Sequence, residues 1–253
     1  MKIDTKFTKK AIATGVSTLI LGLMLSTPAQ AADACEDGSG ADSLECGDGA
    51  FADGEGATAV GDESEASGDA STAVGNRSLA TGFASTAIGA SAEATNIGAV
   101  ALGQSSSATG FQAIAIGQGA TATTTSNTAI GGGAEASGSN STAVGAKTIA
   151  TGTQTVALGV SAEAAGNASI AIGGQSGASE DGAIAIGGDG SDTDALGAQA
   201  TGINTTAIGI DAIASNFGSA AYGAGATASG SQATALGTHS SAIATQSTAV
   251  GAF

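Results

Sequence analysis

Residues 71–89 read STAVGNRSLATGFASTAIG, and within this stretch the motif Ala-(Val/Ile/Leu)-Gly occurs twice, 14 residues apart. The motif occurs fifteen times in the chain, once with Tyr222 at its middle position. Its first ten copies, from Ala59 to Ala185, are each 14 residues apart, after which the spacing is 10, then 12, then 14 again up to Ala249. A fixed short period of this kind is typical of a solenoid, in which each repeat packs mainly on its neighbours. The sequence therefore predicts a stack of about fifteen coils.

The residues before each motif favour strands. Ser71-Thr72-Ala73-Val74 alternates between polar and apolar residues and contains β-branched side chains. Helices are excluded because the periodic glycines would each cost about 1 kcal/mol in a helix. Glycine or asparagine often recurs seven residues after the motif glycine. Because both residues tolerate a positive φ, we expect a second tight turn at each of these positions. They are Gly68, Gly82, Asn96, Gly110, Gly138, Gly152, Gly166, Asn216 and Gly230. One repeat is therefore predicted to be one coil, with two short strands, of a narrow all-β roll. Where the spacing shortens, at residues 195 and 207, we expect shortened turns that leave the stack unbroken.

Side-chain size indicates which residues face the interior. Alanine begins every motif, and a second alanine often lies five residues after the motif glycine, as at Ala66 and Ala80. Neighbouring strand residues point to opposite faces, so the large apolar residue beside each motif alanine is expected to point outward. Such a stripe is a liability on a monomer. We therefore predict an obligate homo-oligomer whose interface contains Val60, Val74, Ile88, Leu102, Ile116, Ile130, Val144, Leu158, Ile172 and Ile186.

A second apolar column lies eight residues after the motif glycine. Phe83, Ile97 and Phe111 occupy this position in three consecutive coils, and Phe217 has the same phase later in the chain. Stacked coils would place the first three about 4.8 Å apart at one edge of the roll. Two interpretations stay open: the column packs against a neighbouring subunit, or it is an exposed strip for an extended protein ligand, since aromatic residues dominate binding hot spots.

Residues 1–31 have the features of a secretory signal peptide. A lysine-rich start is followed by the apolar segment 11–24 and by Ala29-Gln30-Ala31, a typical cleavage site. Fourteen apolar residues are too few to span a bilayer comfortably. Removal of the signal leaves Arg77 and Lys147 against 21 acidic residues, a net charge of 2 − 21 = −19. A chain this acidic is not expected to bind nucleic acid through its phosphates.

The predicted mature chain begins with an acidic segment, residues 32–56, that precedes the repeats of residues 57–253. Its two cysteines, Cys35 and Cys46, are the only ones in the sequence. In an exported protein two cysteines at this separation most simply form one disulfide. We expect residues 32–56 to form a disulfide-tied cap on the first coil.

Candidate chemistry is sparse. The single histidine, His239, is interpreted as a turn residue, and no catalytic set can be assembled around it. The segment 187–194 partly matches a calcium-binding nonapeptide, which makes Asp189, Asp192 and Asp194 weak calcium candidates. That motif works by stacking copies, so a solvated turn is preferred. We predict a protein that is not an enzyme and binds no cofactor.

Segments such as 140–145 (NSTAVG) and 168–173 (ASIAIG) closely resemble the head repeats of trimeric autotransporter adhesins, the YadA-like head. The resemblance covers about residues 57–253. It implies a left-handed parallel β-roll that trimerises side by side. It further implies a bacterial adhesin head, with a role in virulence, that binds collagen or another matrix protein, or other cells during aggregation and biofilm formation.

Members of this family continue into a coiled-coil stalk and a membrane anchor, neither of which is recognised here. We therefore expect display on the outer membrane if an anchor exists, and secretion otherwise. The alternative function is an ice-binding or purely structural solenoid. Ice binding favours a Thr-x-Thr ladder in every coil, whereas the residue before the motif alanine is Thr72 or Thr86 in some coils and Val100 or Ile114 in others.

Overall fold

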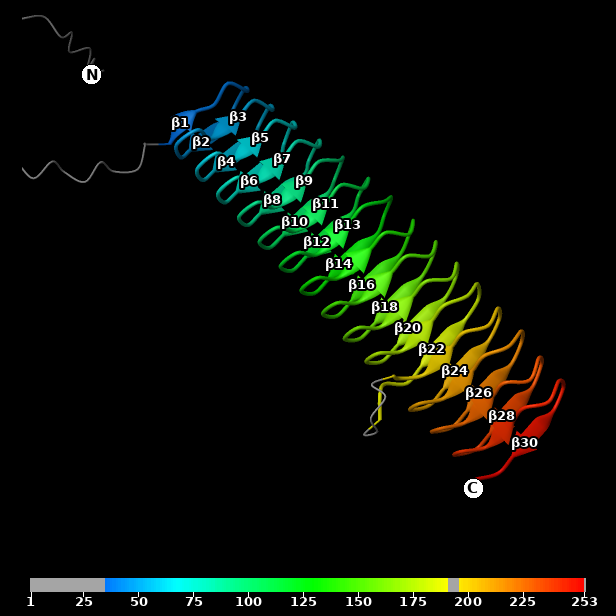
Figure 1. Ribbon diagram of the computed structural model, residues 1–253. Coiled ribbons are helices and arrows are strands. Elements are labelled where there is room, and N and C mark those ends of the chain that lie inside the picture. The colour runs from blue at the N-terminus through cyan, green and yellow to red at the C-terminus, as the bar shows by residue number, and fades with distance from the viewer. Residues whose placement is uncertain (1–34, 191–195, 253) are drawn as a thin grey trace, which may run out of the picture. The chain divides into compact units, whose positions relative to one another are not determined.

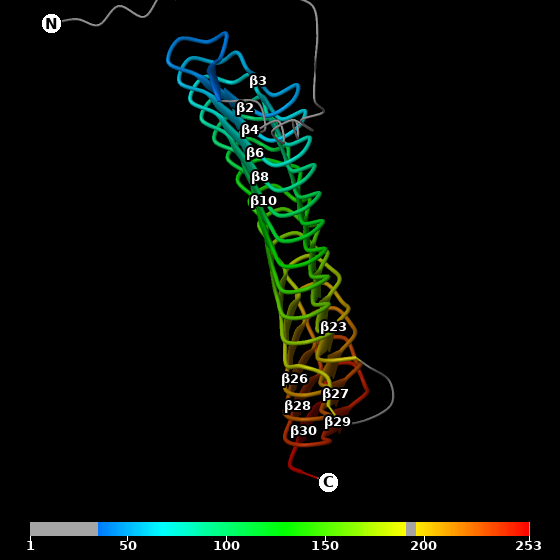
Figure 2. The same cartoon turned by 90° about the vertical axis from the view of Figure 1, so that its left-hand side faces the viewer.

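The computed structural model describes residues 35–190 and 196–252, all within one compact unit, Ala32–Phe253 (Figure 1). The predicted signal peptide, residues 1–31, lies outside the described residues. The described part consists of strands and turns, without helices, and so contains no helix that could cross a membrane. Successive coils stack one on the next along the roll (Figure 2). The predicted all-β parallel solenoid with a 14-residue repeat is confirmed.

Three-residue strands build one sheet of the roll, the long-strand sheet. Apart from its first strand, β1, every neighbouring pair in this sheet is parallel and in register, as in Ala101 opposite Ala115. Its parallel strands are β2 (Leu44–Cys46), β4 (Thr58–Val60), β6 (Thr72–Val74), β8 (Thr86–Ile88), β10 (Val100–Leu102), β12 (Ile114–Ile116), β14 (Thr128–Ile130), β16 (Thr142–Val144), β18 (Val156–Leu158), β20 (Ile170–Ile172), β22 (Ile184–Ile186), β24 (Thr206–Ile208), β26 (Ala220–Tyr222), β28 (Thr234–Leu236) and β30 (Thr248–Val250).

Two-residue strands build the facing short-strand sheet, which is parallel throughout. Each of these strands follows a long strand, after a tight turn in every coil except the one between β22 and β23, so the chain alternates between the two sheets. The strands are β3 (Phe51–Ala52), β5 (Glu65–Ala66), β7 (Leu79–Ala80), β9 (Glu93–Ala94), β11 (Ser107–Ala108), β13 (Thr121–Ala122), β15 (Glu135–Ala136), β17 (Ile149–Ala150), β19 (Glu163–Ala164), β21 (Gly177–Ala178), β23 (Gln199–Ala200), β25 (Ile213–Ala214), β27 (Thr227–Ala228) and β29 (Ser241–Ala242).

The roll begins one coil earlier than the boundary expected at residue 57. Strand β2 pairs in parallel with β4 and places Glu45 opposite Ala59. Glu45 therefore stands where later coils have the motif alanine, and its Oε1 accepts a hydrogen bond from the Ala52 N–H at 2.7 Å. Strand β1 (Glu36–Asp37) pairs with β2 in the antiparallel direction, and Cys35 is disulfide-bonded to Cys46. The first coil was missed because its inward residue is not alanine.

The interior is narrow and built from small residues. Every buried hydrophobic residue in the described part is an alanine, and the largest fully buried side chains are asparagine and threonine, led by Asn127. The motif alanines and the alanines of the short strands face one another across the roll, as Ala59 and Ala66 do, both fully buried. This is the thin interior that the pattern of small residues predicts.

The second turn of each coil has its left-handed residue two positions later than the sequence suggested. Gly82 and the other glycines seven residues after the core glycine (the glycine that ends each motif) do not have a positive φ; Ala84, two residues later, does, at 52°. The Ser85 N–H donates to the Gly82 carbonyl at 3.1 Å, the arrangement of a type II turn. Glycine suits position 82 because a Cβ there would lie 2.0 Å from the Asn96 carbonyl oxygen of the next coil. Close packing between coils, rather than φ, favours glycine at this position.

The irregular spacing near residue 195 is an insertion and not a pair of shortened turns. Strand β22 pairs directly with β24, so Ala185 lies opposite Ala207. Leu196 and Gly197, the described residues of the intervening motif copy, form no strand of the ladder. The Ala198 N–H donates to the Gly187 carbonyl at 3.0 Å, the bond that Ala92 makes to Gly89 in a regular coil. One coil of 22 residues therefore replaces the two short coils that the spacings of 10 and 12 suggested. Its first turn has 22 − 14 = 8 more residues than the first turn of a regular coil.

Deleting residues 189–196 is expected to leave a folded roll. The deletion joins Gly188 to Gly197 and restores the four-residue turn between Gly187 and Ala198, in which glycine readily adopts the required positive φ. Thermal unfolding followed by circular dichroism should give a midpoint within a few degrees of the parent, because insertions and deletions in turns are well tolerated. Loss of the β-sheet spectrum would show that these residues are part of the stack.

Two fully buried serines should respond oppositely to alanine substitution. The Ser64 hydroxyl donates to the Gly61 carbonyl at 2.8 Å, whereas the buried Ser71 hydroxyl has no hydrogen-bond partner. Ser64→Ala should cost about 1 kcal/mol of unfolding free energy, while Ser71→Ala should be neutral or stabilising by about 1 kcal/mol. Ala92 and Ala99 occupy the equivalent positions in another coil, so neither change strains the backbone. Equal destabilisation by both changes, measured in denaturant titrations, would contradict this interpretation of the interior.

Candidate functional site

The outer face of the long-strand sheet is uncharged from β4 to β30. It consists of the first and third residues of strands β4 to β30, and we call it the apolar face. Threonine, valine, isoleucine, leucine, alanine and one tyrosine make up this face, and no residue on it is charged. Most of these side chains are half-buried against their neighbours in adjacent coils, while Ile130 remains 36% exposed and Leu236 48% exposed.

The predicted interface residues all lie on the apolar face. They occupy the third position of strands β4 to β22 and form one in-register column, in which Leu102 lies beside Ile116 and Ile116 beside Ile130. The motif alanines between them point inward and are fully buried. The first strand position, occupied by Thr86 or Ile114, adds a second column to the same face.

The short-strand sheet has a different outer face. Glutamates occupy its first strand position at Glu65, Glu93, Glu135 and Glu163. Hydroxyl residues largely fill the neighbouring column, which lies one residue after each short strand. Leu79, Ile149 and Ile213 also occupy the first strand position, so this face is mixed. Because charges and hydroxyls suit contact with water, it is the more polar of the two faces. The apolar face is the one suited to assembly.

The column that contains Phe83 lies on the edge formed by the second turn of each coil, the second-turn edge. Phe83, Ile97 and Phe111 are 57%, 49% and 40% exposed. Backbone hydrogen bonds link their coils directly, since the Gly98 N–H donates to the Phe83 carbonyl at 2.9 Å. The structure thus brings the three residues of the predicted strip together on one exposed edge.

Ile203 belongs to the same column and was missed in the sequence. The Gly218 N–H donates to the Ile203 carbonyl at 3.0 Å, which places Ile203 directly beside Phe217 in the column. Ile203 is 45% exposed and Phe217 51% exposed. The 8-residue insertion hid the phase of Ile203, and reading the spacings of 10 and 12 together as one coil would have revealed it.

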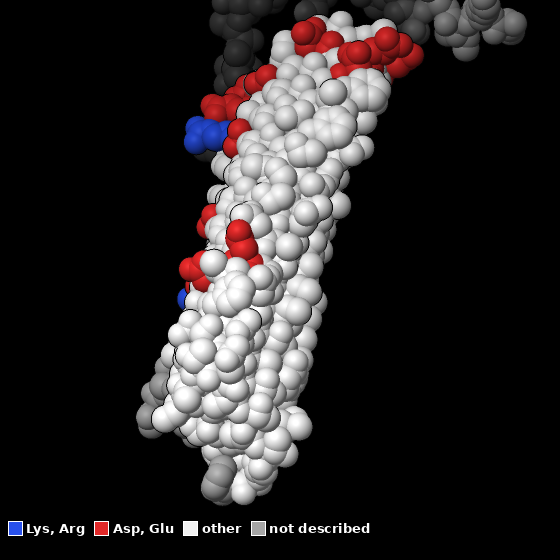
Figure 3. Space-filling model, turned by 90° about the vertical axis from the view of Figure 1, so that its right-hand side faces the viewer, with Lys and Arg blue, Asp and Glu red and all other residues white. Residues whose placement is uncertain are grey.

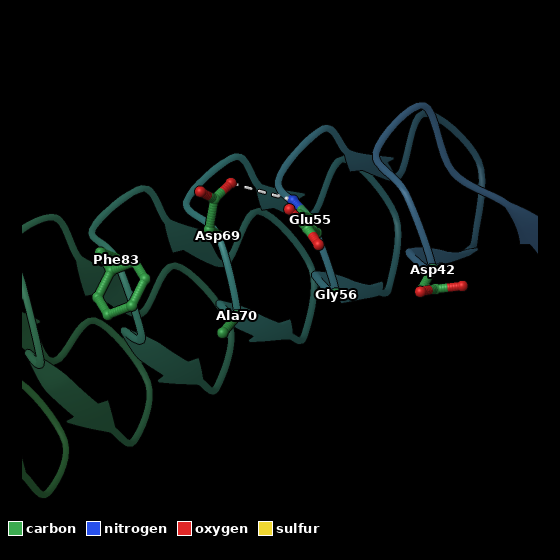
Figure 4. Close-up of a pocket in the computed structure, with 6 residues that line it drawn as sticks. All are labelled: Asp42, Glu55, Gly56, Asp69, Ala70 and Phe83. Atoms are coloured by element: carbon green, nitrogen blue, oxygen red, sulfur yellow. Dashed lines mark hydrogen bonds between the residues drawn. The ribbon is translucent and has the colours of Figure 1, made fainter.

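Acidic residues precede Phe83 on the second-turn edge. A shallow pocket there follows four neighbouring coils (Figure 4) and is lined by Asp42, Glu55, Gly56, Asp69, Ala70 and Phe83. The Asp69 Oδ1 accepts a hydrogen bond from the Glu55 N–H at 3.1 Å, which holds this carboxylate along the edge. Glu55 and Asp69 occupy the same coil position as Phe83, 28 and 14 residues earlier, so the 14-residue period could have revealed them.

Charge is concentrated at the N-terminal end of the roll. Figure 3 shows acidic side chains gathered there, while most of the rest of this view is uncharged. In the described part the one ion pair joins the Arg77 Nε to the Glu63 Oε2 at 2.5 Å, on the first-turn edge. The hydrogen bond from Arg77, together with its positive charge, lowers the pKa of Glu63 below its usual value. The acids of the second-turn edge have no such partner among the described residues.

The remaining candidates show no assembled chemistry. His239 is an exposed turn residue with a φ of 55°, as the sequence suggested. Of the calcium candidates, Asp192 and Asp194 lie outside the described residues, and the Asp189 Oδ1 is buried without a hydrogen-bond partner. No group of three or more His, Cys, Asp or Glu side chains suited to a metal ion occurs within residues 35–190 and 196–252.

A one-coil repeat, an alanine interior and an uncharged outer face define a narrow parallel β-roll. The family of the YadA head domain repeat matches residues 52–78, 80–106, 108–126, 128–148, 150–176, 166–189 and 228–253, more than half of the chain. The chain belongs to this family, and its function is of the adhesin type. The unmatched residues 190–227 include part of the insertion, yet β23 to β26 continue the ladder there.

One similar structure is the collagen-binding domain of the Yersinia adhesin YadA, at 23% sequence identity and a TM-score of 0.29, covering 69% of each chain. No curated protein sequence matches the chain significantly.

Proposed function

We propose that this chain is the head of a homotrimeric bacterial adhesin, exported by residues 1–31 and displayed at the cell surface or secreted. In this proposal the disulfide-tied first coil closes the N-terminal end of the roll, and the roll as a whole forms the trimer and binds the target. The target is collagen or another extracellular matrix protein, or a second cell in aggregation and biofilm formation. The head acts by binding and not by catalysis.

The apolar face carries the proposal. Two uncharged columns run along one side of the roll from Thr58 to Val250, whereas the opposite sheet carries glutamates. Exposed apolar surface of this extent marks a binding or assembly surface in a soluble protein. A second and third copy of the chain, each presenting the same columns, would cover it in a closed assembly. An adhesin head gains from such assembly because several copies bind a repetitive target together.

Adherence of the purified chain, residues 32–253, tests the proposed function. Fluorescently labelled protein should bind wells coated with collagen or another matrix protein, or bacterial or host cells, above the level on albumin-coated wells. Beads that carry the protein should also aggregate if the target is a second adhesive cell. Binding to none of these surfaces, by a protein with a normal β-sheet spectrum, would rule the proposal out.

A further inference from the structure

The second-turn edge combines two kinds of side chain in a fixed order. Three coils contribute carboxylates, from Asp42, Glu55 and Asp69, and the next three contribute Phe83, Ile97 and Phe111. All six residues are exposed. Six coils at about 4.8 Å between neighbours span about 24 Å, the length of about seven residues of extended chain.

We propose that this edge binds an extended polypeptide segment that has lysine or arginine at one end and apolar residues at the other. The carboxylates have no ion-pair partner in the described part, so they remain available to cations on a ligand. The exposed phenyl rings offer apolar anchors of the kind that dominate protein binding sites. The pocket runs from Asp42 to Phe83 and so includes both the carboxylates and the first phenyl ring, which a long basic side chain could contact together (Figure 4).

The same order recurs further along the edge, which argues for a specific arrangement. Glu180 and Asp181 precede Ile203 and Phe217 in neighbouring coils, and all four residues are exposed. The Asp181 Oδ1 accepts the Asn167 N–H at 2.8 Å, just as the Asp69 Oδ1 accepts the Glu55 N–H. Both sites thus present a carboxylate held along the edge, followed by a ladder of large apolar residues. One extended target with repeated basic and apolar segments could contact both sites.

This inference deepens the proposed adhesive function and rests on it for its biological role, but its test uses a defined probe. The probe is a fluorescent heptapeptide, Lys-Ser-Lys-Ser-Leu-Ser-Phe, whose alternate residues share one face in an extended chain. Fluorescence anisotropy should show binding at least tenfold tighter than that of a peptide with glutamates in place of the lysines. Binding should weaken on moving from low to high salt, because exposed charges are screened.

Substitutions locate the site. Replacing Phe83, Phe111 and Phe217 with serine should weaken peptide binding at least tenfold. Neutralising the carboxylates of both sites, with Glu55→Gln, Asp69→Asn and Asp181→Asn, should remove most of its salt dependence. The control for the apolar residues is Ser139→Ala with Thr153→Ala, on the same edge. The control for the carboxylates is Asp48→Asn with Asp62→Asn, on the first-turn edge. Both double variants should bind the peptide as tightly as the parent does.

Two further readouts separate this inference from the alternatives. If the triple serine variant sediments as a smaller species than the parent, the column is an interface between copies of the chain and the inference is wrong. The inference is also wrong if the peptide fails to bind, or if the controls weaken binding equally. A parent protein that adheres to matrix or cells without binding the peptide would leave the proposed function standing. If the protein binds the peptide but adheres to no surface, the inferred peptide site on the second-turn edge stands and the proposed adhesive function does not.

Discussion

Aspartate in place of both Ile116 and Ile130 is expected to separate the chains of the assembly or unfold them. These residues are neighbours in one column of the apolar face, where a second copy of the chain would bury them. An unpaired buried carboxylate costs several kcal/mol, more than one interface contact can offset. Sedimentation velocity should therefore show the mass of a single chain, or circular dichroism should show loss of the sheet, and adherence should be lost with either.

The control places the same two charges on the other sheet. Thr109 and Thr123 lie in one column outside the short strands, in the neighbouring coils that begin at the core glycines Gly103 and Gly117. Thr109→Asp with Thr123→Asp should keep the parent mass and spectrum, because this face is the more polar of the two. A double aspartate variant of the apolar face that sediments like the parent would exclude that face as the interface.

The second large effect is expected at a core glycine. Gly117 has a φ of 130°, and a Cβ on it would lie 2.5 Å from the Gly131 carbonyl oxygen of the next coil. Gly117→Ala should therefore cost about 3 kcal/mol or more, since backbone strain alone contributes about 1–3 kcal/mol and the clash with a fixed backbone adds to it. The unfolding midpoint should fall by about 10 °C, at about 2–4 °C per kcal/mol for a chain of this size.

Gly119, in the same turn, is the matched control. Its φ is 64°, a Cβ there would meet no atom within 4 Å, and Ser105 and Lys147 adopt the same conformation in equivalent positions. Gly119→Ala should lower the midpoint by only a few degrees. Equal effects of the two alanine substitutions would mean that the contact between core glycines does not limit the stacking of coils.

The 14-residue period was sufficient to predict the class of fold. Alanine at positions such as Ala59 and Ala66 predicted a narrow interior, and alternation within Thr72-Ala73-Val74 predicted which side chains point outward. Both follow from local rules: the two-residue period of strands, and the small space between two closely packed sheets. The placement of Phe83 and Phe111 in one column at an edge of the roll followed from the same period.

The features that were missed break the motif or depend on contacts between coils. The first coil has Glu45 where later coils have alanine, and an inward glutamate gives no repeat signal although its carboxylate finds a donor in the Ala52 N–H. The insertion before Ala198 contains a copy of the motif, which concealed that one coil is longer until strand pairing showed it. Glycine is favoured at Gly82 because a Cβ there would clash with the Asn96 carbonyl oxygen of the next coil. The sequence of a single repeat does not reveal this contact between coils.

Assembly through the apolar face is the central claim, and the mass of the parent protein in solution tests it most directly. Light scattering coupled to size-exclusion chromatography, on residues 32–253 at micromolar concentration, should give three times the mass of one chain. A mass equal to one chain, from protein with an intact β-sheet spectrum, would contradict the claim.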